Sequence, residues 1–165
     1  MSTFVTVGNA HQPFQRLLDA VAAVVNQLPQ PVIVQYGHGQ FTAPGCDARA
    51  FVTMAEFERL IEAADLVVQH AGGGGVLYAI RAGKVPVIMP RRALLGEHID
   101  DHQVENAEAL ARTGKAVVVH EAEKLLAGVR QALALQRHSR PATGTSEMVR
   151  LISAVLDRYA RQISA

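Results

Sequence analysis

The chain has 165 residues, a length that fits one domain with a substantial core, and 49% of its residues are hydrophobic. Its formal net charge of +1 gives no indication of a nucleic-acid surface, and its one cysteine, Cys46, excludes an internal disulfide and a multi-cysteine metal site. The sequence shows no signal peptide, and no apolar run reaches the ~20 residues that cross a bilayer, so we expect a cytoplasmic protein.

Short apolar runs alternate with helical patterns along the chain. In chain order we expect strand 3–7, helix 14–28, strand 32–36, strand 50–52, helix 54–63, strand 66–68, helix 75–82, strand 86–89, helix 100–112, strand 116–119 and helix 122–135. Pro29 and Pro31 end the first helix, and Gly83 and Gly114 are predicted to cap the helices before them. The segment 40–49 is expected to be irregular because it contains proline and glycine.

The predicted strands are short and rich in β-branched residues, and helices separate most of them. This pattern is typical of a parallel sheet covered on both faces, so we predict a doubly wound α/β domain with a Rossmann-like parallel sheet over residues 1–138. The segment 139–145 (SRPATGT) is predicted to be a linker to an amphipathic helix at 146–165. That helix either folds back on the sheet or docks on a partner, and its apolar stripe comprises Met148, Leu151, Ile152, Val155, Leu156, Tyr159 and Ile163.

Four consecutive glycines at 72–75 stand between the strand at 66–68 and the next helix. A helix N-terminus presents unpaired backbone N–H groups and a partial positive charge, and small residues there let a diphosphate approach closely. We therefore favour phosphate binding over a tight turn without a ligand. The run is not a Walker A loop, because Val76 and Leu77 stand where the lysine and hydroxyl are needed, and its mid-chain position does not fit the dinucleotide fingerprint.

Three blocks carry a resemblance to a known family: HAGGGG at 70–75, AIRAGKVPVIMP at 79–90 and HQVENA at 102–107. Together they resemble the C-terminal domain of family 28 glycosyltransferases. That family includes the N-acetylglucosaminyltransferase of the peptidoglycan lipid precursor. It also has stand-alone small subunits, namely the soluble subunit of the eukaryotic dolichol-linked UDP-N-acetylglucosamine transferase and PssE-like exopolysaccharide glycosyltransferase subunits. The resemblance implies that this chain is the donor-binding half of a GT-B fold.

The resemblance also implies a set of substrate-binding residues. The glycine loop would bind the donor diphosphate through backbone N–H groups, and the residues concerned are Ala71, Gly72, Gly73, Gly74 and Gly75. His102 and Gln103 would bind the donor sugar, because an amide and a neutral imidazole both donate and accept hydrogen bonds.

Four further candidate residues lie just beyond the ends of predicted strands. Gly8 and Asn9 would lie close to the diphosphate and the acceptor. His70 either holds the glycine turn through a local hydrogen bond or contacts the ligand directly. His38 either acts on the acceptor or the base, or is an exposed loop histidine.

Other polar residues near these positions have less specific roles. Arg91 and Arg92 either help to neutralise a diphosphate or form a solvated basic loop. Asp100 and Asp101 are interpreted as helix-capping residues, and Asn106 as a source of a structural hydrogen bond. We identify no catalytic residue, since no carboxylate stands at a convincing general-base position.

The sequence therefore predicts a subunit that binds a nucleotide sugar, in particular a UDP-sugar. We expect a two-component glycosyltransferase that transfers a hexose to a lipid-linked acceptor in exopolysaccharide assembly. A membrane-anchored partner would supply the acceptor site and hold this chain at the inner face of the membrane, and the isolated chain is a candidate homodimer. We expect no cofactor, no bound metal and no nucleic-acid partner.

Three alternatives use the same type of scaffold. A non-catalytic nucleotide or nucleotide-sugar sensor would bind without turnover and remains open. A receiver or flavodoxin-like module lacks support, because only Asp65 precedes its strand and the loop at 71–75 has no aromatic residue. An epimerase related to UDP-N-acetylglucosamine 2-epimerase would require a second domain.

Overall fold

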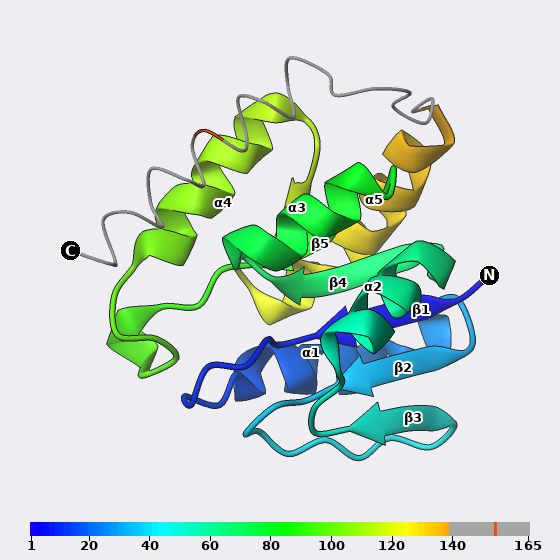
Figure 1. Cartoon of the computed structure of the whole chain (residues 1–165), viewed down its shortest axis with the longest axis horizontal. Helices are drawn as coiled ribbons and strands as arrows, with labels where there is room; N and C mark the ends of the chain where they lie inside the picture. Colours follow the sequence, from blue (N-terminus) through cyan, green and yellow to red (C-terminus); the bar gives the residue numbers. More distant parts are fainter. Residues whose placement is uncertain (139–153, 155–165) are drawn as a thin grey trace.

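The computed structural model describes residues 1–138 and Ala154. Figure 1 shows strands and helices alternating along the chain. The strands are β1 (Thr3–Thr6), β2 (Val32–Gln35), β3 (Cys46–Arg49), β4 (Leu66–His70), β5 (Val87–Met89) and β6 (Val117–Val118). The α-helices are α1 (Gln15–Val24), α2 (Met54–Ala63), α3 (Gly73–Arg81), α4 (His102–Thr113) and α5 (Leu125–His138), and the 3-10 turns are η1 (Val25–Gln27), η2 (Ala93–Leu95) and η3 (Ala122–Lys124).

The strands form one parallel sheet in the order β3-β2-β1-β4-β5-β6. β1 lies at its centre, where Thr3 is in register with Val32 of β2 on one side and with Leu66 of β4 on the other. The central strands are buried on both faces, which explains their continuous apolar sequence. The doubly wound Rossmann-like sheet predicted from the sequence is confirmed.

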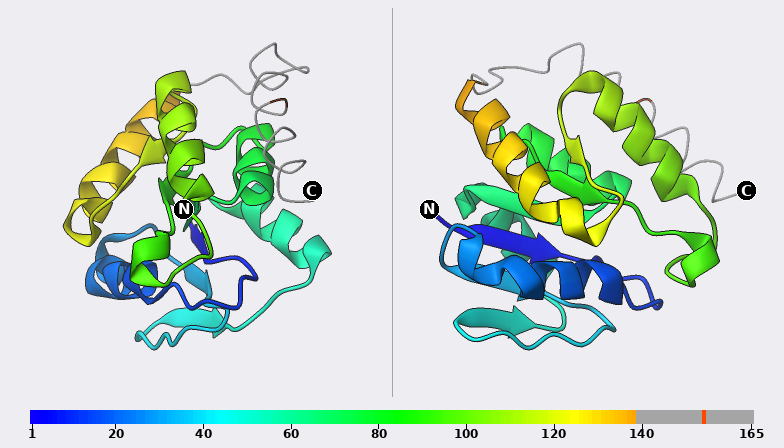
Figure 2. Two further views of the ribbon diagram at one scale, coloured as in Figure 1. Left: turned by 90° about the vertical axis from the view of Figure 1, so that its left-hand side faces the viewer. Right: turned by 180° about the vertical axis from the view of Figure 1, so that it is seen from behind.

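Helices cover both faces of this sheet (Figure 2). α1 and α5 pack on one face around Leu17, Val21 and Val129, which are almost completely buried. α2, α3 and α4 lie on the other face, where α3 contributes Val76 and Ile80 to a cluster with α4, and Ala79 to a cluster with α2. The helix after β1 thus lies on the opposite face from the helix after the neighbouring strand β4.

This change of face defines a switch point at the carboxyl ends of β1 and β4. The loops that follow the two strands leave toward opposite faces and open a crevice between them, which is where open α/β sheets bind ligands. The first loop contains Gly8, whose φ of +74° is a conformation that glycine adopts without strain. The second loop contains Ala71 and Gly72 and leads directly into α3.

The predicted strand at 50–52 is wrong, because the edge strand is β3, which the sequence analysis treated as irregular. β3 pairs with β2 in parallel, with Cys46 in register with Val32. Its residues are partly or fully exposed, and Arg49 forms ion pairs with Asp47 and Glu56. A polar edge strand lacks the run of apolar residues that marks a buried strand. The apolar residues at 50–52, which follow β3, were therefore predicted as the strand instead.

Several element ends also differ from the prediction. α3 begins at Gly73, so three of the four glycines belong to the helix and Gly72 is its N-cap residue. α4 begins at His102 rather than at residue 100, and β6 is shorter than expected. The predicted linker at 139–145 and helix at 146–165 lie outside the described residues, apart from Ala154. Within the described part of the chain, no helix is both long enough and apolar enough to cross a membrane.

Candidate donor-binding site

The N-terminus of α3 lies at the switch point of the sheet. The backbone N–H groups in the first turn of an α-helix have no partner within the helix, and they carry a partial positive charge. Gly72 supplies no side-chain cap, and no acidic residue lies in the first turn. The end of α3 is therefore open to an anion.

The glycines at this helix end serve different purposes. A Cβ atom on Gly72 would lie under 3.0 Å from the ring of His70, and one on Gly75 would lie 2.6 Å from Oε1 of Gln69. Both positions must therefore be glycine to make room for side chains of β4. A Cβ atom on Gly74 would meet no atom within 4 Å, so packing does not explain that glycine.

His70 is enclosed between the two loops of the switch point. A Cβ atom on Gly8 would lie 2.5 Å from its Cε1, so glycine flanks the ring on this side as Gly72 does on the other. Burial and the positive charge of Arg91 lower the pKa of His70 to about 3, which leaves the imidazole neutral at physiological pH. Its Nδ1 atom is buried without a hydrogen-bond partner. The ring also lines the adjoining pocket, so its place fits both roles considered for it.

A pocket of about 330 Å³ adjoins this helix end at the carboxyl edge of the sheet. One wall is apolar and comes from the start of α2 and from α3, with Phe57 and Tyr78 in an edge-to-face contact at 6.0 Å between ring centroids. The floor is formed by polar residues at the ends of the central strands. The lining residues are Thr6, Gly8, Asn9, Gln35, Val52, Met54, Phe57, His70, Gly74, Gly75 and Tyr78.

The polar floor is a hydrogen-bonded unit that fixes the loop after β1. Oγ1 of Thr6 donates to Oε1 of Gln35 and accepts from the backbone N–H of Gly8 at 3.2 Å. Nε2 of Gln35 donates to the carbonyl oxygens of Gly8 at 3.0 Å and Ala50 at 3.3 Å. The loops after β1 and β3 are thereby held in place around the pocket.

Gln69 lies beneath the first turn of α3. The residue has no exposed surface, and neither its Oε1 nor its Nε2 atom has a hydrogen-bond partner. A buried amide without partners is costly, at about 1–3 kcal/mol for each unsatisfied group. The unpaired amide lies beneath Gly75, and Gln69 is not among the residues that line the pocket.

The predicted sugar-binding pair lies at the start of α4. Gln103 is buried, and its Oε1 accepts a hydrogen bond from the backbone N–H of Arg91 at 3.2 Å, so it holds the loop after β5. His102 is partly exposed, and its Nδ1 contacts Oδ1 of Asp100. His98 and His102 are both close enough to His70 to act on it electrostatically, which places this segment near the end of β4.

Only one of the two acidic residues before α4 caps the helix with its side chain. Asp101 occupies the N-cap position, but its Oδ1 accepts from the backbone N–H of Ala93 at 2.8 Å and so holds η2. Asp100 accepts instead from the backbone N–H of His102 at 3.2 Å. The Oδ1 atom of Asn106, for which we expected a structural hydrogen bond, is buried without a partner.

Arg91 is a structural residue and not part of a solvated loop. It is 1% exposed, and its guanidinium donates to the carbonyl oxygens of Val7 at 2.6 Å, Gln12 at 2.7 Å and Glu97 at 2.8 Å. It therefore ties the loop after β1 to the loop after β5, and its charge is directed to backbone oxygens. Arg92, by contrast, is partly exposed and pairs with Glu121 at 3.1 Å.

Of the two remaining candidates, Asn9 lies at the pocket and His38 does not. Asn9 is exposed and lines the pocket, with its Oδ1 3.5 Å from Nε2 of Gln35. His38 is exposed on the loop after β2 and contacts the rings of His11 and Phe51, at 5.3 and 5.1 Å between centroids. It is not among the residues that line the pocket.

Sequence reasoning missed the apolar wall of the pocket. Val52 was assigned to a strand, while Phe57 and Tyr78 have the spacing of ordinary helix residues. The signal that could have revealed them is position, since the start of α2 and the first turns of α3 follow strands whose carboxyl ends meet at one edge.

The family model that matches this chain is the glycosyltransferase family 28 C-terminal domain, over residues 2–157. The chain is 32% identical over 150 residues to the UDP-N-acetylglucosamine transferase subunit ALG13 of Yarrowia lipolytica, covering 83% of this chain and 73% of that subunit. It is 30% identical over 109 residues to the UDP-N-acetylglucosamine--N-acetylmuramyl-(pentapeptide) pyrophosphoryl-undecaprenol N-acetylglucosamine transferase of Syntrophus aciditrophicus, covering 66% of this chain and 29% of that enzyme.

Solved glycosyltransferase structures share the fold. The chain superimposes on MurG of Acinetobacter baumannii with a TM-score of 0.56 at 24% identity, covering 92% of this chain and 49% of that one. The calicheamicin glycosyltransferase CalG4 gives a TM-score of 0.62 at 18% identity, covering 99% of this chain and 41% of that one. The sheet therefore corresponds to the Rossmann-like half of a GT-B glycosyltransferase. From the family match over most of its length, the chain belongs to glycosyltransferase family 28, as its C-terminal domain.

Proposed function

We propose that this chain is the UDP-sugar-binding subunit of a two-component glycosyltransferase. The nucleoside occupies the pocket against the apolar wall formed with Phe57 and Tyr78. The diphosphate lies on the backbone N–H groups of Gly73, Gly74 and Gly75, and the sugar extends toward His102 and Gln103. The observation that carries the proposal is the junction at Gly74, where an open helix end meets a pocket and packing gives no reason for glycine.

The dimensions and chemistry of the site suit such a donor. A pocket of about 330 Å³ lies within the range of small-ligand sites, and its aromatic wall offers surfaces to a planar base. The amide groups of α3 stabilise the negative charge that develops on the diphosphate as it leaves, without a step that requires a metal. Neutral His70 at the junction donates or accepts a hydrogen bond but adds no charge.

The acceptor side of the reaction is assigned to a partner. The matched relative from Yarrowia lipolytica is described as a subunit, and this chain spans most of its length but less than a third of the bacterial transferase. The bacterial relative acts on a pyrophosphoryl-undecaprenol substrate. We propose by analogy that this chain transfers a hexose to a lipid-linked acceptor, for example in exopolysaccharide assembly, together with a membrane-anchored subunit that holds it at the cytoplasmic face.

The proposal is tested by calorimetric titration with UDP, with ADP as the competing nucleotide. We expect saturable binding of UDP, and weaker binding of ADP because the pocket must distinguish the bases. In the variant Gly74→Asp a carboxylate enters open space at the end of α3 and repels the diphosphate, so UDP binding should fall at least tenfold.

A matched control places the same charge elsewhere. Ala127 is exposed in the first turn of α5, on the opposite face of the sheet, and Ala127→Asp should bind UDP like the wild-type protein. Equal binding of UDP by Gly74→Asp and Ala127→Asp would overturn the placement of the diphosphate. Absence of any nucleotide binding by the wild-type chain would overturn the proposal for the isolated subunit.

A further inference from the structure

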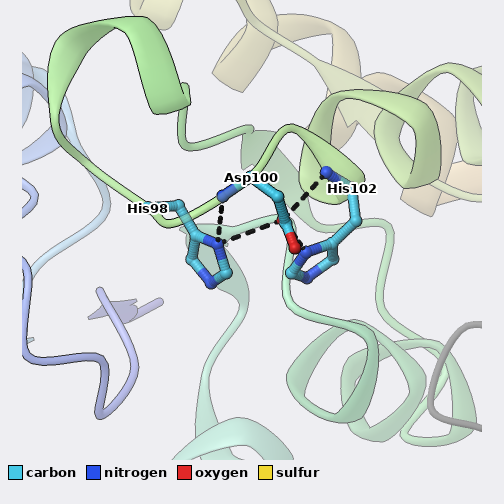
Figure 3. Close-up of side chains that lie close together, drawn as sticks. All are labelled: His98, Asp100 and His102. Atoms are coloured by element: carbon cyan, nitrogen blue, oxygen red, sulfur yellow. Dashed lines mark hydrogen bonds and ion pairs between the residues drawn. The ribbon is translucent and has the colours of Figure 1, made fainter. Parts of the chain in front are cut away.

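Three metal-ligating side chains lie together just before and at the start of α4: His98, Asp100 and His102 (Figure 3). One ligand atom from each lies within 4.8 Å of the others. We expected no bound metal from the sequence, because the family that the chain resembles usually needs none. The spacing His-x-Asp-x-His brings the three groups together within one short segment, with the Asp100 carboxylate beside both imidazole rings.

The separation between His98 and Asp100 matches that of two ligands in a metal coordination shell. Two ligands of a tetrahedral zinc ion with bonds of about 2.1 Å lie about 3.4 Å apart. Nδ1 of His98 is 3.3 Å from Oδ1 of Asp100. Nδ1 of His102 is in direct contact with the same oxygen, and the two ring centroids are 4.6 Å apart. An ion would replace this contact between His102 and Asp100.

Nδ1 of His98 lies close to two atoms of Asp100. It is 3.3 Å from Oδ1, the separation of an ion pair or a hydrogen bond, and 3.5 Å from the backbone nitrogen. A nitrogen and a carboxylate oxygen held this close can share one bound cation in place of a proton.

The ligand set also selects the class of ion. Two imidazoles and one carboxylate suit zinc and related transition metals, whereas magnesium and calcium prefer shells made of oxygen atoms. The side chains of His98, Asp100 and His102 are 16%, 47% and 20% exposed, which leaves an open side for water or another ligand.

We propose that His98, Asp100 and His102 form a binding site for one divalent transition-metal ion of the zinc type. Such an ion links the loop after η2 to the first residue of α4 and so stiffens the segment that carries Gln103. The site shares His102 with the proposed contact to the donor sugar, but it is defined by side chains that lie close together and it requires no nucleotide. Its test uses the metal alone.

The experiment is a calorimetric titration of the metal-free full chain with Zn²⁺, repeated with Mg²⁺. We expect one equivalent of Zn²⁺ to bind, no saturable binding of Mg²⁺, and a rise in the melting temperature with Zn²⁺. His98→Ala removes a ligand and Asp100→Asn removes the charge while keeping the shape. Each should weaken Zn²⁺ binding at least ~10-fold. Nickel or cobalt ions, used in place of zinc, should bind at the same site.

A control addresses incidental binding by other histidines. His11 and His38 lie in contact at 5.3 Å between centroids and form the obvious competing pair, so His11→Ala should bind Zn²⁺ like the wild-type protein. Circular dichroism of each variant establishes that it is folded before titration. The proposal is overturned if the wild-type chain binds no Zn²⁺. It is also overturned if binding survives unchanged in both His98→Ala and Asp100→Asn, or is lost in His11→Ala alone.

Discussion

The substitution Gly74→Ala separates the structural role of the glycine run from its role in binding. Gly74 is the second residue of α3, its φ is not positive, and a Cβ atom there meets nothing within 4 Å. Alanine is favoured over glycine in a helix by about 0.5–1 kcal/mol, so the unliganded variant should be more stable than the wild-type protein. For a chain of this size that corresponds to a rise of about 1–4 °C in the melting temperature.

The same methyl group should weaken nucleotide binding. Gly74 lines the pocket at the end of α3, and a methyl group there occupies space through which the diphosphate must approach the backbone N–H groups. We expect the affinity for UDP to fall at least tenfold, or by about 1.4 kcal/mol. If Gly74 only formed a turn, its replacement by alanine would not be expected to stabilise the fold and weaken ligand binding at the same time.

The measurements are thermal unfolding without ligand and calorimetric titration with UDP. Gly72→Ala provides the contrast, because its Cβ atom would lie under 3.0 Å from the ring of His70 and should destabilise the protein. If Gly74→Ala binds UDP as tightly as the wild-type protein, the diphosphate does not lie on this helix end. If it melts below the wild-type protein, the description of Gly74 as unobstructed is wrong.

Three further predictions concern stability. The pKa of His70 is lowered to about 3 in the folded protein, against about 6.5 in the unfolded chain. The free energy of unfolding should therefore fall as the pH drops from about 6.5 toward 3. This group should contribute up to ~1.4 kcal/mol per pH unit to the fall. Urea titrations should show a flatter pH dependence for His70→Gln, and equal slopes would contradict the assignment. Arg91→Met leaves three backbone carbonyls without their donor and should lower the free energy of unfolding, measured by urea titration, by at least about 3 kcal/mol. A decrease below ~1 kcal/mol would refute the structural role of Arg91. Arg16 and Glu97 form two hydrogen bonds of 2.8 Å, and their side chains are only 19% and 7% exposed. A double-mutant cycle with Arg16→Met and Glu97→Gln should therefore give a coupling free energy of about 1–3 kcal/mol. Additive effects of the two substitutions on stability would show that the pair is not coupled.

The strands that the sequence predicted well are the buried ones. The runs of β1, β2 and β4 are apolar because both of their faces are covered, so local composition reports their state directly. β3 was missed because it forms the edge of the sheet and carries Asp47 and Arg49, which neighbouring charges stabilise. Its pairing with β2 is a long-range contact that no local pattern expresses.

The candidate site was likewise predicted only in part. The glycine run and the HQVENA block are contiguous in sequence, so resemblance to a family was enough to single them out. The sequence did not show why Gly72 and Gly75 must be glycine, because the reason lies in the side chains of His70 and Gln69 that pack beneath them. The aromatic wall of Phe57 and Tyr78 was also missed, because it forms only when the successive helices α2 and α3 pack against each other.

The most direct test of the proposed function is a crystal structure of the full chain with UDP. We predict that the diphosphate oxygens lie within about 2.7–3.2 Å of the backbone nitrogens of Gly73, Gly74 or Gly75, and that the base lies against Phe57 and Tyr78. A nucleotide bound elsewhere, or in this pocket with its diphosphate directed away from α3, would contradict the proposal.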